Sequence, residues 1–355
     1  MLACVLLACV GGSTRGAGIT VALATDTPTP APTLSPTPPE EPETPGGPER
    51  ITVAFVGDLM FQREVEQAMV EIDVGYPLER ALELFEGADL VVGNLEGAVT
   101  DVGVPLVKQY QFALDPALAG GLTPFWAVSL SNNHATDYGL TGLERTLETL
   151  DEHGIAWFGA GRTEAEARAG IVGRLPGAPT IAYLGYDDIG EVIWASGETG
   201  GVARASAPAI AEDVARVRAA GDVDFVVVTL HAGTEYTHRV TARQRELAYA
   251  AVDAGADLVV GTHPHVLQHV ERYEDGLILY SLGNFVFDLD EDDLVTLGEG
   301  PFQSVVALVT FEAGQPLALE LRPARIDVYE NRPRPATAEE AEAILALLGH
   351  AEAGN

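Results

Sequence analysis

Short apolar runs recur along the chain from Ile51 onwards, with turn residues between them. Runs of this length that are rich in Val, Ile and Leu are typical of strands buried on both faces. The runs that predict strands are Ile51–Val56, Leu90–Val92, Ala127–Leu130, Thr180–Leu184, Phe225–Leu230, Leu258–Val260 and Leu277–Tyr280. This pattern predicts sheet layers in the interior of the protein.

The segments between these runs carry apolar residues at helical spacing. They predict helices at Phe61–Val70, Pro77–Phe85, Gly142–Glu152, Pro208–Ala219 and Arg243–Asp253. The last of these follows a capping-box pattern, Thr241 with Gln244, that marks its start. A final helix is predicted at Ala336–Leu348.

Two longer runs, Ser304–Phe311 and Leu317–Arg322, alternate apolar and polar residues. The stretch that begins at Gly314 and continues with Gln and Pro lies between them, which predicts an antiparallel pair joined by a turn. No internal repeat is visible in the sequence. Strands that alternate with helices predict a single α/β domain, with sheets inside and helices outside.

Polar residues follow most of the predicted strands. The six polar strand ends carry Asp58, then Asn94 with Glu96, then Asn132, Asn133 and His134, then His231 with Glu235, then His263 and His265, and last Ser281 with Asn284. In α/β sheets the carboxyl ends of the strands converge, so these side chains are expected to lie close together. Carboxylate, amide and imidazole donors suit cations such as Mn²⁺, Fe²⁺ and Zn²⁺. The pattern therefore predicts a metal site.

Each strand end alone has a simpler explanation. Asp58 can cap the next helix, the pair Asn132-Asn133 can form a turn, and a lone His after a strand can be structural. The pair His263 and His265 is the strongest single signal, because imidazoles one residue apart point two ways and can serve two neighbouring metal positions. The joint pattern favours a metal site over chance placement.

The charge of the chain limits its partners. With 53 acidic and 20 basic residues, the formal net charge is −33. Such a field repels phosphate backbones and anionic lipid, so no nucleic-acid partner is expected. A polyanionic ligand would need a locally positive site, which a bound metal ion can supply.

The first fifty residues predict a signal segment followed by a linker. The only cysteines, Cys4 and Cys9, lie in the first ten residues, and Leu6 to Cys9 resembles a bacterial lipobox. Residues 1–25 are therefore expected to be a signal or lipoprotein segment, and residues 26–50 a Pro/Thr-rich disordered linker. The expected location is extracytoplasmic, with membrane attachment through an N-terminal lipid. The usual preceding basic residues are missing, so either the true start lies upstream or the match arises by chance at an ordinary frayed terminus.

The order of the strand-end residues resembles that of the calcineurin-like metallophosphoesterases. The motifs are still more similar to those of the CapA branch, the bacterial capsule or poly-γ-glutamate synthesis proteins. The stretches that carry this resemblance are Val56–Met60, Gly93–Glu96, Ser131–His134, His231–Tyr236, Asp253–His265 and Tyr280–Phe285. The resemblance covers roughly residues 51–330 and leaves 331–355 as a C-terminal helix and tail.

The resemblance implies a four-layer α/β/β/α sandwich with one or two divalent metal ions, Mn, Fe or Zn. By this resemblance, Glu96 would bridge two ions or hold the more occupied one. Asn133, His231 and His263 would bind one ion, and Asp58 and His265 would serve the other. His134 would stand beside the site as the catalytic residue, where it protonates a leaving oxygen or steadies the transition state.

The sequence departs from the broader superfamily at Met60, where a histidine is usual. A thioether is a poor ligand for hard cations, so one metal position loses a donor. The CapA branch shares this departure. Two functions therefore stay open: a metal-dependent hydrolase of a phosphoester or a cell-surface polymer linkage, and a non-catalytic component of a membrane assembly that makes or exports capsule polymer.

Four further residues are candidates for contacts around the metals or with substrate. Lys108, the only lysine, lies in the loop after Glu96 and either meets an anionic substrate or is solvated. Glu235 and Tyr236 either orient His231 or a substrate, or form the start of the next helix. Asn284 is expected to organise the turn at the last strand.

Overall fold

The computed structural model describes residues 50–349. The lipobox-like stretch and residues 26–49 of the predicted linker lie outside the described residues, so both stay predictions. Within residues 50–349, no helix has the length and apolar character that a bilayer span requires.

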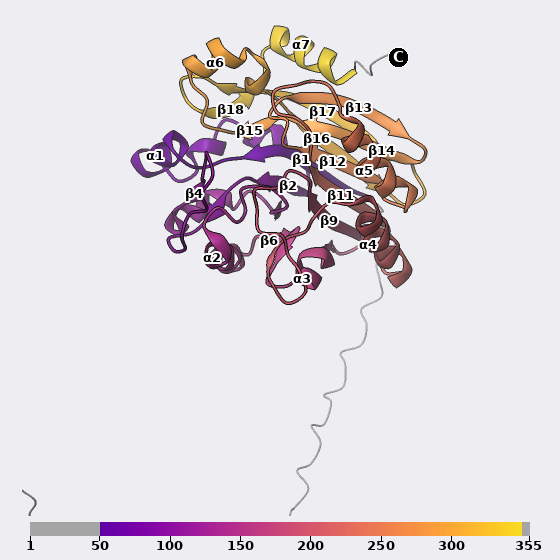
Figure 1. The fold of residues 1–355 in the computed structure, drawn as a ribbon. Coiled ribbons are helices and arrows are strands. Elements are labelled where there is room, and N and C mark those ends of the chain that lie inside the picture. The colour runs from indigo at the N-terminus through magenta and orange to yellow at the C-terminus, as the bar shows by residue number, and fades with distance from the viewer. Residues whose placement is uncertain (1–49, 350–355) are drawn as a thin grey trace, which may run out of the picture. The chain divides into compact units, whose positions relative to one another are not determined.

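Two sheets form the centre of the described part of the chain (Figure 1). The first has the order β18-β17-β16-β1-β2-β5-β6, and β15 also pairs with β1. Its strands are β1 (Arg50–Leu59), β2 (Leu90–Leu95), β5 (Ala127–Ser129), β6 (Ala156–Phe158), β15 (Asn284–Val286), β16 (Gln303–Glu312), β17 (Ala318–Asp327) and β18 (Arg332–Pro335). Strands β1, β2, β5 and β6 are parallel, whereas β16, β17 and β18 run antiparallel.

The second sheet has the order β13-β14-β12-β11-β9-β8. Its strands are β8 (Ile171–Gly173), β9 (Ile181–Asp187), β11 (Phe225–His231), β12 (Leu258–Thr262), β13 (Leu267–Tyr273) and β14 (Gly276–Leu282). The four inner strands are parallel, and the edge strands β8 and β13 are antiparallel to their neighbours. Two small sheets pair β3 (Ala98–Val99) with β4 (Ala113–Leu114), and β7 (Ala160–Gly161) with β10 (Gly201–Val202).

Helices cover the outer faces of both sheets. The α-helices are α1 (Glu64–Glu71), α2 (Gly139–Glu152), α3 (Glu164–Ala169), α4 (Ala207–Ala220), α5 (Ala242–Asp253), α6 (Glu291–Leu297) and α7 (Ala338–Gly349). Short 3₁₀ helices are η1 (Tyr76–Leu78), η2 (Leu82–Phe85), η3 (Pro116–Leu122) and η4 (Gly300–Phe302). The capping box predicted at Thr241 and Gln244 is confirmed at the start of α5.

The alternation of side chains along each strand separates three apolar layers. On β1, Ile51, Val53 and Phe55 join the core between the two sheets, and Ala54 and Val56 face the opposite way. That second face packs with buried residues of α1 and α2, and the outer face of the second sheet packs with α4 and α5. The predicted α/β/β/α sandwich is thereby confirmed.

Two elements differ from the sequence prediction. The segment predicted as a helix at Pro77–Phe85 forms the two 3₁₀ turns η1 and η2 instead. A helix this short gains few backbone hydrogen bonds, and tight turns are enough to bury Leu78 and Phe85. The predicted strand at Leu317–Arg322 extends to Asp327 as β17, and the proline-containing β18 pairs with it at the edge of the sheet, where a missing N–H is tolerated.

The chain passes from one sheet to the other at Gly283. Strand β14 of the second sheet ends at Leu282, and β15 of the first sheet begins at Asn284. Gly283 has φ 68°, and its carbonyl accepts a hydrogen bond of 3.0 Å from the N–H of Asp58. The backbone of Gly57 comes so close here that a Cβ at this position would lie 1.8 Å from the Gly283 carbonyl oxygen. The two sheets are thus joined beside Asp58.

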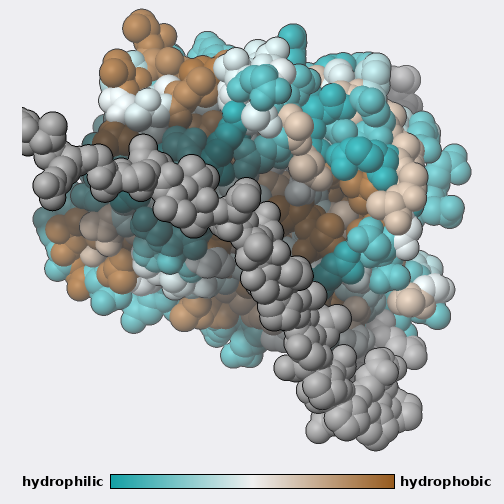
Figure 2. Space-filling view, turned by 90° about the horizontal axis from the view of Figure 1, so that it is seen from below, coloured by the Kyte–Doolittle hydropathy of each residue, from teal (hydrophilic) through white to brown (hydrophobic). Residues whose placement is uncertain are grey.

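Seen from below, the described surface mixes hydrophilic and hydrophobic residues in small areas (Figure 2). Several large apolar side chains are exposed on the loop between β3 and β4, with Val104 at 78% and Tyr110 at 51% exposure. This loop also carries Lys108, which reaches the site described next.

Candidate metal centre

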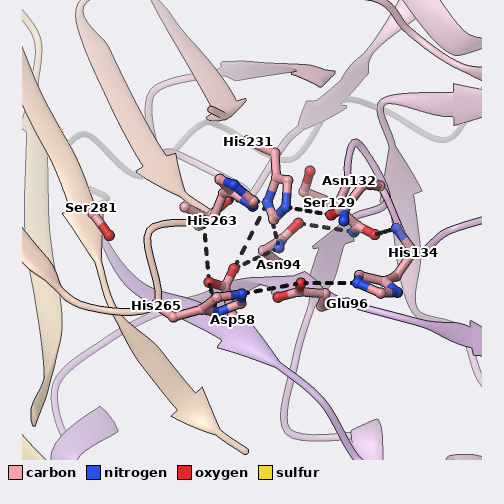
Figure 3. Close-up of polar contacts among 12 residues, drawn as sticks. Asp58, Asn94, Glu96, Ser129, Asn132, His134, His231, His263, His265 and Ser281 are labelled. Carbon is pink, nitrogen blue, oxygen red and sulfur yellow. Dashed lines mark hydrogen bonds and ion pairs between the residues drawn. The ribbon is translucent and has the colours of Figure 1, made fainter. Parts of the chain in front are cut away.

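The two sheets bring their polar strand ends to one place (Figure 3). Asp58 and Asn94 lie near the ends of β1 and β2, and His231 is the last residue of β11. His263 and His265 follow β12 directly. Because the central strands of each sheet are parallel, their carboxyl ends open toward the same region. The structure brings together all six predicted metal ligands: Asp58, Glu96, Asn133, His231, His263 and His265.

The carboxylates of Asp58 and Glu96 have no exposed surface. Asp58 Oδ2 lies 3.4 Å from Nδ1 of His265, and Asp58 Oδ1 lies 4.0 Å from Nδ1 of His231. Glu96 Oε1 lies 3.8 Å from Nε2 of His265 and 3.8 Å from Nε2 of His134. Each of these three imidazoles thus has a nitrogen 3.4–4.0 Å from a carboxylate oxygen, which is longer than a short hydrogen bond.

A second group of donors meets around His231. Its Nε2 lies 2.9 Å from Oδ1 of Asn133, and its Nδ1 lies 2.9 Å from the hydroxyl of Thr262. The ring of His263 has its centroid 4.9 Å from that of His231. The backbone N–H of His263 donates to Asp58 Oδ2 at 3.2 Å, which connects this group to the first.

The residues present fit a bound divalent cation. Both carboxylate oxygens of Glu96 and Nδ1 of His263 are buried and have no hydrogen-bond partner within residues 50–349. Buried polar atoms without partners are uncommon and need an explanation. Asp58, Glu96 and His265 each offer a ligand atom, and these atoms lie within 4.8 Å of one another. Carboxylate and imidazole donors are the ligands that such cations take.

The pKa shifts at this centre follow from burial and from the neighbouring charges. Burial lowers the pKa of His231 well below its usual value and lowers the pKa of His263 to about 3, so both imidazoles are neutral, as metal ligands must be. Burial and the nearby Asp58 carboxylate raise the pKa of Glu96 well above its usual value. Burial alone would lower the pKa of His265, but Glu96 and Asp58 raise it to about 10.

Several polar residues hold these groups in place. Asn94 donates to Asp58 Oδ1 at 2.8 Å, and Asn132 donates to Asn94 Oδ1 at 3.2 Å and accepts from the N–H of His134 at 3.0 Å. Asn284 Oδ1 lies 2.8 Å from Nδ1 of His265, so it leaves Nε2 as the free ring nitrogen. No role was assigned to Asn94 or Asn132 from the sequence, although both stand inside the motifs that carry the family resemblance.

Asp137 is a buried residue of the site that the sequence reasoning missed. Its Oδ2 lies 2.8 Å from Nδ1 of His134 and accepts from the N–H of Phe112 at 2.7 Å. Its Oδ1 lies 2.6 Å from Nζ of Lys108. The signal available in the sequence was its spacing, three residues after His134 and before a glycine-led helix.

The remaining candidates lie around this centre. Lys108 has a side chain only 6% exposed and also donates to the carbonyl of Asn133 at 2.7 Å, so it is not a solvated loop residue. Glu235 lies on the exposed loop after β11, and one of its carboxylate oxygens lies within 4.8 Å of ring nitrogens of His263 and His265. The ring of Tyr236 has its centroid 5.9 Å from that of His265.

A family model agrees with these motifs. The model described as bacterial capsule synthesis protein PGA_cap matches residues 52–289, which hold every donor named above. The chain belongs to this family. The resemblance to capsule synthesis proteins that the motifs carry is thereby confirmed.

Two Bacillus members of known name are similar to this PGA_cap chain. The capsule biosynthesis protein CapA of Bacillus anthracis is 33% identical over 254 residues, which is 68% of this chain and 60% of that protein. The PGA biosynthesis protein CapA of Bacillus subtilis (strain 168) is 34% identical over 249 residues, which is 67% of this chain and 63% of that protein. The chain therefore spans less than two thirds of the length of either relative.

Among solved structures, the 5′-nucleotidase precursor from Thermus thermophilus is similar in fold. It has a TM-score of 0.46 and 16% sequence identity, and the match covers 84% of this chain and 58% of that chain.

Proposed function

We propose that this PGA_cap chain is a metal-dependent hydrolase in capsule or poly-γ-glutamate production, acting on a phosphoester or a cell-surface polymer linkage. The observation that carries the proposal is the buried Glu96, whose two oxygens have no hydrogen-bond partner within residues 50–349 although imidazoles surround them. A polar group left in this state at the meeting of two sheets is suited to a cation. The names of the two Bacillus relatives support the link to polymer production.

The residues divide into two sets of donors for one or two ions, with Mn²⁺, Fe²⁺ and Zn²⁺ as candidates. Asp58, Glu96 and His265 would hold one ion, and Asn133, His231 and His263 the other. A bound divalent cation supplies polarisation of a substrate oxygen and activation of water.

His134 would carry the proton that a leaving oxygen needs. Its Nδ1 contacts Asp137, and its Nε2 is directed to the site, 3.8 Å from Glu96. The ring of Phe112 lies with its centroid 4.3 Å from that of His134 and covers one side of the imidazole. This leaves one ring nitrogen available for proton transfer to substrate.

The proposed place of action is outside the cytoplasmic membrane, with a lipid on Cys9 and the membrane proteins of polymer synthesis as partners. The lipobox-like stretch and the Pro/Thr-rich segment of the sequence support this location. The net charge of −33 repels polyanions, so contact with polyglutamate would be local and would depend on the positive charge of bound metal.

The hydrolase proposal is tested with purified protein, Mn²⁺ and a chromogenic phosphodiester. Metal-loaded wild type is expected to release the chromophore, and the double variant Asp58→Ala/His231→Ala is expected to be slower by roughly 100-fold or more, because it loses one donor from each set. Asp101→Ala is the matched control, since this aspartate is 59% exposed and lies outside the site.

Equal inactivity of metal-loaded wild type and the double variant would contradict hydrolysis of this linkage. A non-catalytic role in the synthesis assembly is favoured by the loss of the donor at Met60, and it predicts a different result in cells. In that case, a deletion strain would recover its surface polymer when it produces Asp58→Ala.

A further inference from the structure

The donor set around Asp58 has no ligand at the position of Met60. Asp58, Glu96 and His265 form a compact group of three ligand atoms. In the superfamily that the motifs resemble, the residue two after Asp58 is a histidine, but here it is Met60, which is fully buried. A thioether is a poor donor for the cations that carboxylates attract, and such ions take at least four ligands. The donor set around Asp58 therefore leaves room for a further ligand, from the protein or from solvent.

Glu235 offers a further donor beside His263 and His265. Its carboxylate and ring nitrogens of His263 and His265 offer three ligand atoms within 4.8 Å of one another. His265 belongs to this group and also to the group with Asp58 and Glu96. Asn284 occupies Nδ1 of His265, so Nε2 is the nitrogen left for a metal ion. Glu235 is exposed, whereas the other donors are buried, so it approaches His265 from the solvent side.

The backbone holds the loop of Glu235 against the loop of the two histidines. The N–H of Tyr236 donates to the carbonyl of Pro264 at 2.8 Å. Three residues of these two turns have left-handed backbone: Tyr236 with φ 57°, His263 with φ 94° and His265 with φ 57°. Such values are uncommon for residues other than glycine, and they concentrate at functional sites. The closeness of Glu235 to His265 is therefore set by two tied turns.

We propose that Glu235 is a further ligand of the metal centre, on the side of His263 and His265. This inference rests on the proposed metal centre. Glu235 would add a carboxylate beside these two imidazoles, on the side of the centre that faces solvent. Carboxylate donors favour hard cations such as Mn²⁺.

The test measures metal binding and needs no substrate. Wild type, Glu235→Ala and Glu235→Gln are stripped with a chelator and titrated with Mn²⁺, with affinity from calorimetry and stoichiometry from elemental analysis. Wild type is expected to bind two ions. Glu235→Ala is expected to weaken one of them by roughly 100-fold and leave the other unchanged, and Glu235→Gln to lie between, because an amide oxygen is a weaker donor.

A matched control separates ligation from a general change of charge. Glu198→Ala removes one negative charge from another exposed loop of the same chain and is expected to bind both ions as wild type does. Electron paramagnetic resonance of bound Mn²⁺ gives a second readout, since the coupling between neighbouring ions disappears in Glu235→Ala.

The outcomes distinguish the inference from the proposed function. Two ions in wild type with unchanged affinities in Glu235→Ala would overturn the role of Glu235 and leave the metal centre standing. A single ion in wild type, unaffected by Glu235→Ala, would also overturn it. Wild type that binds no Mn²⁺, Fe²⁺ or Zn²⁺ would overturn both the inference and the proposed hydrolase.

Discussion

The carboxylate of Asp137 holds three groups beside the site: the imidazole of His134, the ammonium of Lys108 and the N–H of Phe112. Burial lowers the pKa of His134, the contact with Asp137 raises it, and the positive charge of Lys108 lowers it. Asp137 and Lys108 therefore act on the same imidazole with opposite signs.

Opposite pH shifts are expected from two variants at this place. Asp137→Asn removes the contact that raises the pKa of His134, so the pH at which activity falls on the alkaline side moves down. The kcat also drops by roughly 100-fold, because His134 is no longer oriented. Lys108→Met removes a positive charge that lowers the pKa of His134, so the pH at which activity falls on the alkaline side moves up. Hydrolysis of the chromogenic phosphodiester between pH 5 and 9 measures both, with metal content as the control.

If the two variants shifted the pH profile in the same direction, or did not shift it, this would show that His134 does not transfer the proton. The exposed Asp101→Asn, in the same loop as Lys108, is expected to leave the pH profile unchanged.

The strand-end argument placed the main donors correctly in space because it depends only on where parallel strands end. It could not find Asp137, nor Asp187, a buried residue that lies opposite His231 at the end of β9. Asp137 acts through contacts with a loop 25 residues earlier, which only the tertiary fold creates. Asp187 was missed because the predicted strand stopped at Leu184, whereas β9 continues to Asp187 and adds a further polar strand end. Whether each donor binds metal stays a prediction.

At the scale of elements, the crossing from β14 to β15 depends on Gly57. A Cβ there would lie 1.8 Å from the carbonyl oxygen of Gly283, so backbone would have to move. Gly57→Ala is therefore expected to destabilise the protein by roughly 3 kcal/mol or more. Thermal unfolding followed by circular dichroism measures the effect.

Gly120→Ala is the matched control for this substitution. Its Cβ would have only Val74 Cγ2 at 4.0 Å as a neighbour, so a change within roughly 0.5 kcal/mol is expected. A melting temperature of Gly57→Ala within about 2 °C of wild type would contradict the close approach of these backbones.

The strands were predictable because each central strand is a short apolar run buried on both faces. The elements at the edges of the sheets were less predictable. The short β6, which pairs with β5, and the edge strand β13 gave no such run, and the segment between Pro77 and Phe85 has helical spacing yet forms 3₁₀ turns. Their conformation depends on the sheet or helix they pack against, which the local sequence does not specify.

At the scale of the whole molecule, stability is expected to depend on the pH near neutrality. Burial raises the pKa of Asp187 to about 7, well above the ordinary value of about 3.9 for an unfolded chain. The folded state therefore binds this proton more tightly than the unfolded state. The stability from the proton is fully present below about pH 4 and is lost as the pH rises through 7.

Asp187→Asn removes this ionisation and keeps the shape of the side chain. The variant is expected to exceed wild type in free energy of unfolding by roughly 2–4 kcal/mol at pH 8, and by less at pH 5. Urea denaturation at the two pH values measures the difference. Glu198→Gln, at an exposed position, is expected to have the same free energy of unfolding as wild type at both pH values. If the difference between Asp187→Asn and wild type were equal at pH 8 and pH 5, this would be evidence against ionisation of the buried Asp187.

The passage of the chain between sheets at Gly283 has a consequence for exchange of a bound ion. Asp58 and Glu96 lie on or directly after strands of one sheet, and His231 and His263 on or directly after strands of the other. Separation of the two sheets at Gly283 would move the proposed metal ligands apart. A bound ion would therefore stabilise the contact between the sheets. In the proposed metal centre, uptake of an ion and separation of the two sheets would be one coupled equilibrium, so removal of metal would lower the stability of the protein.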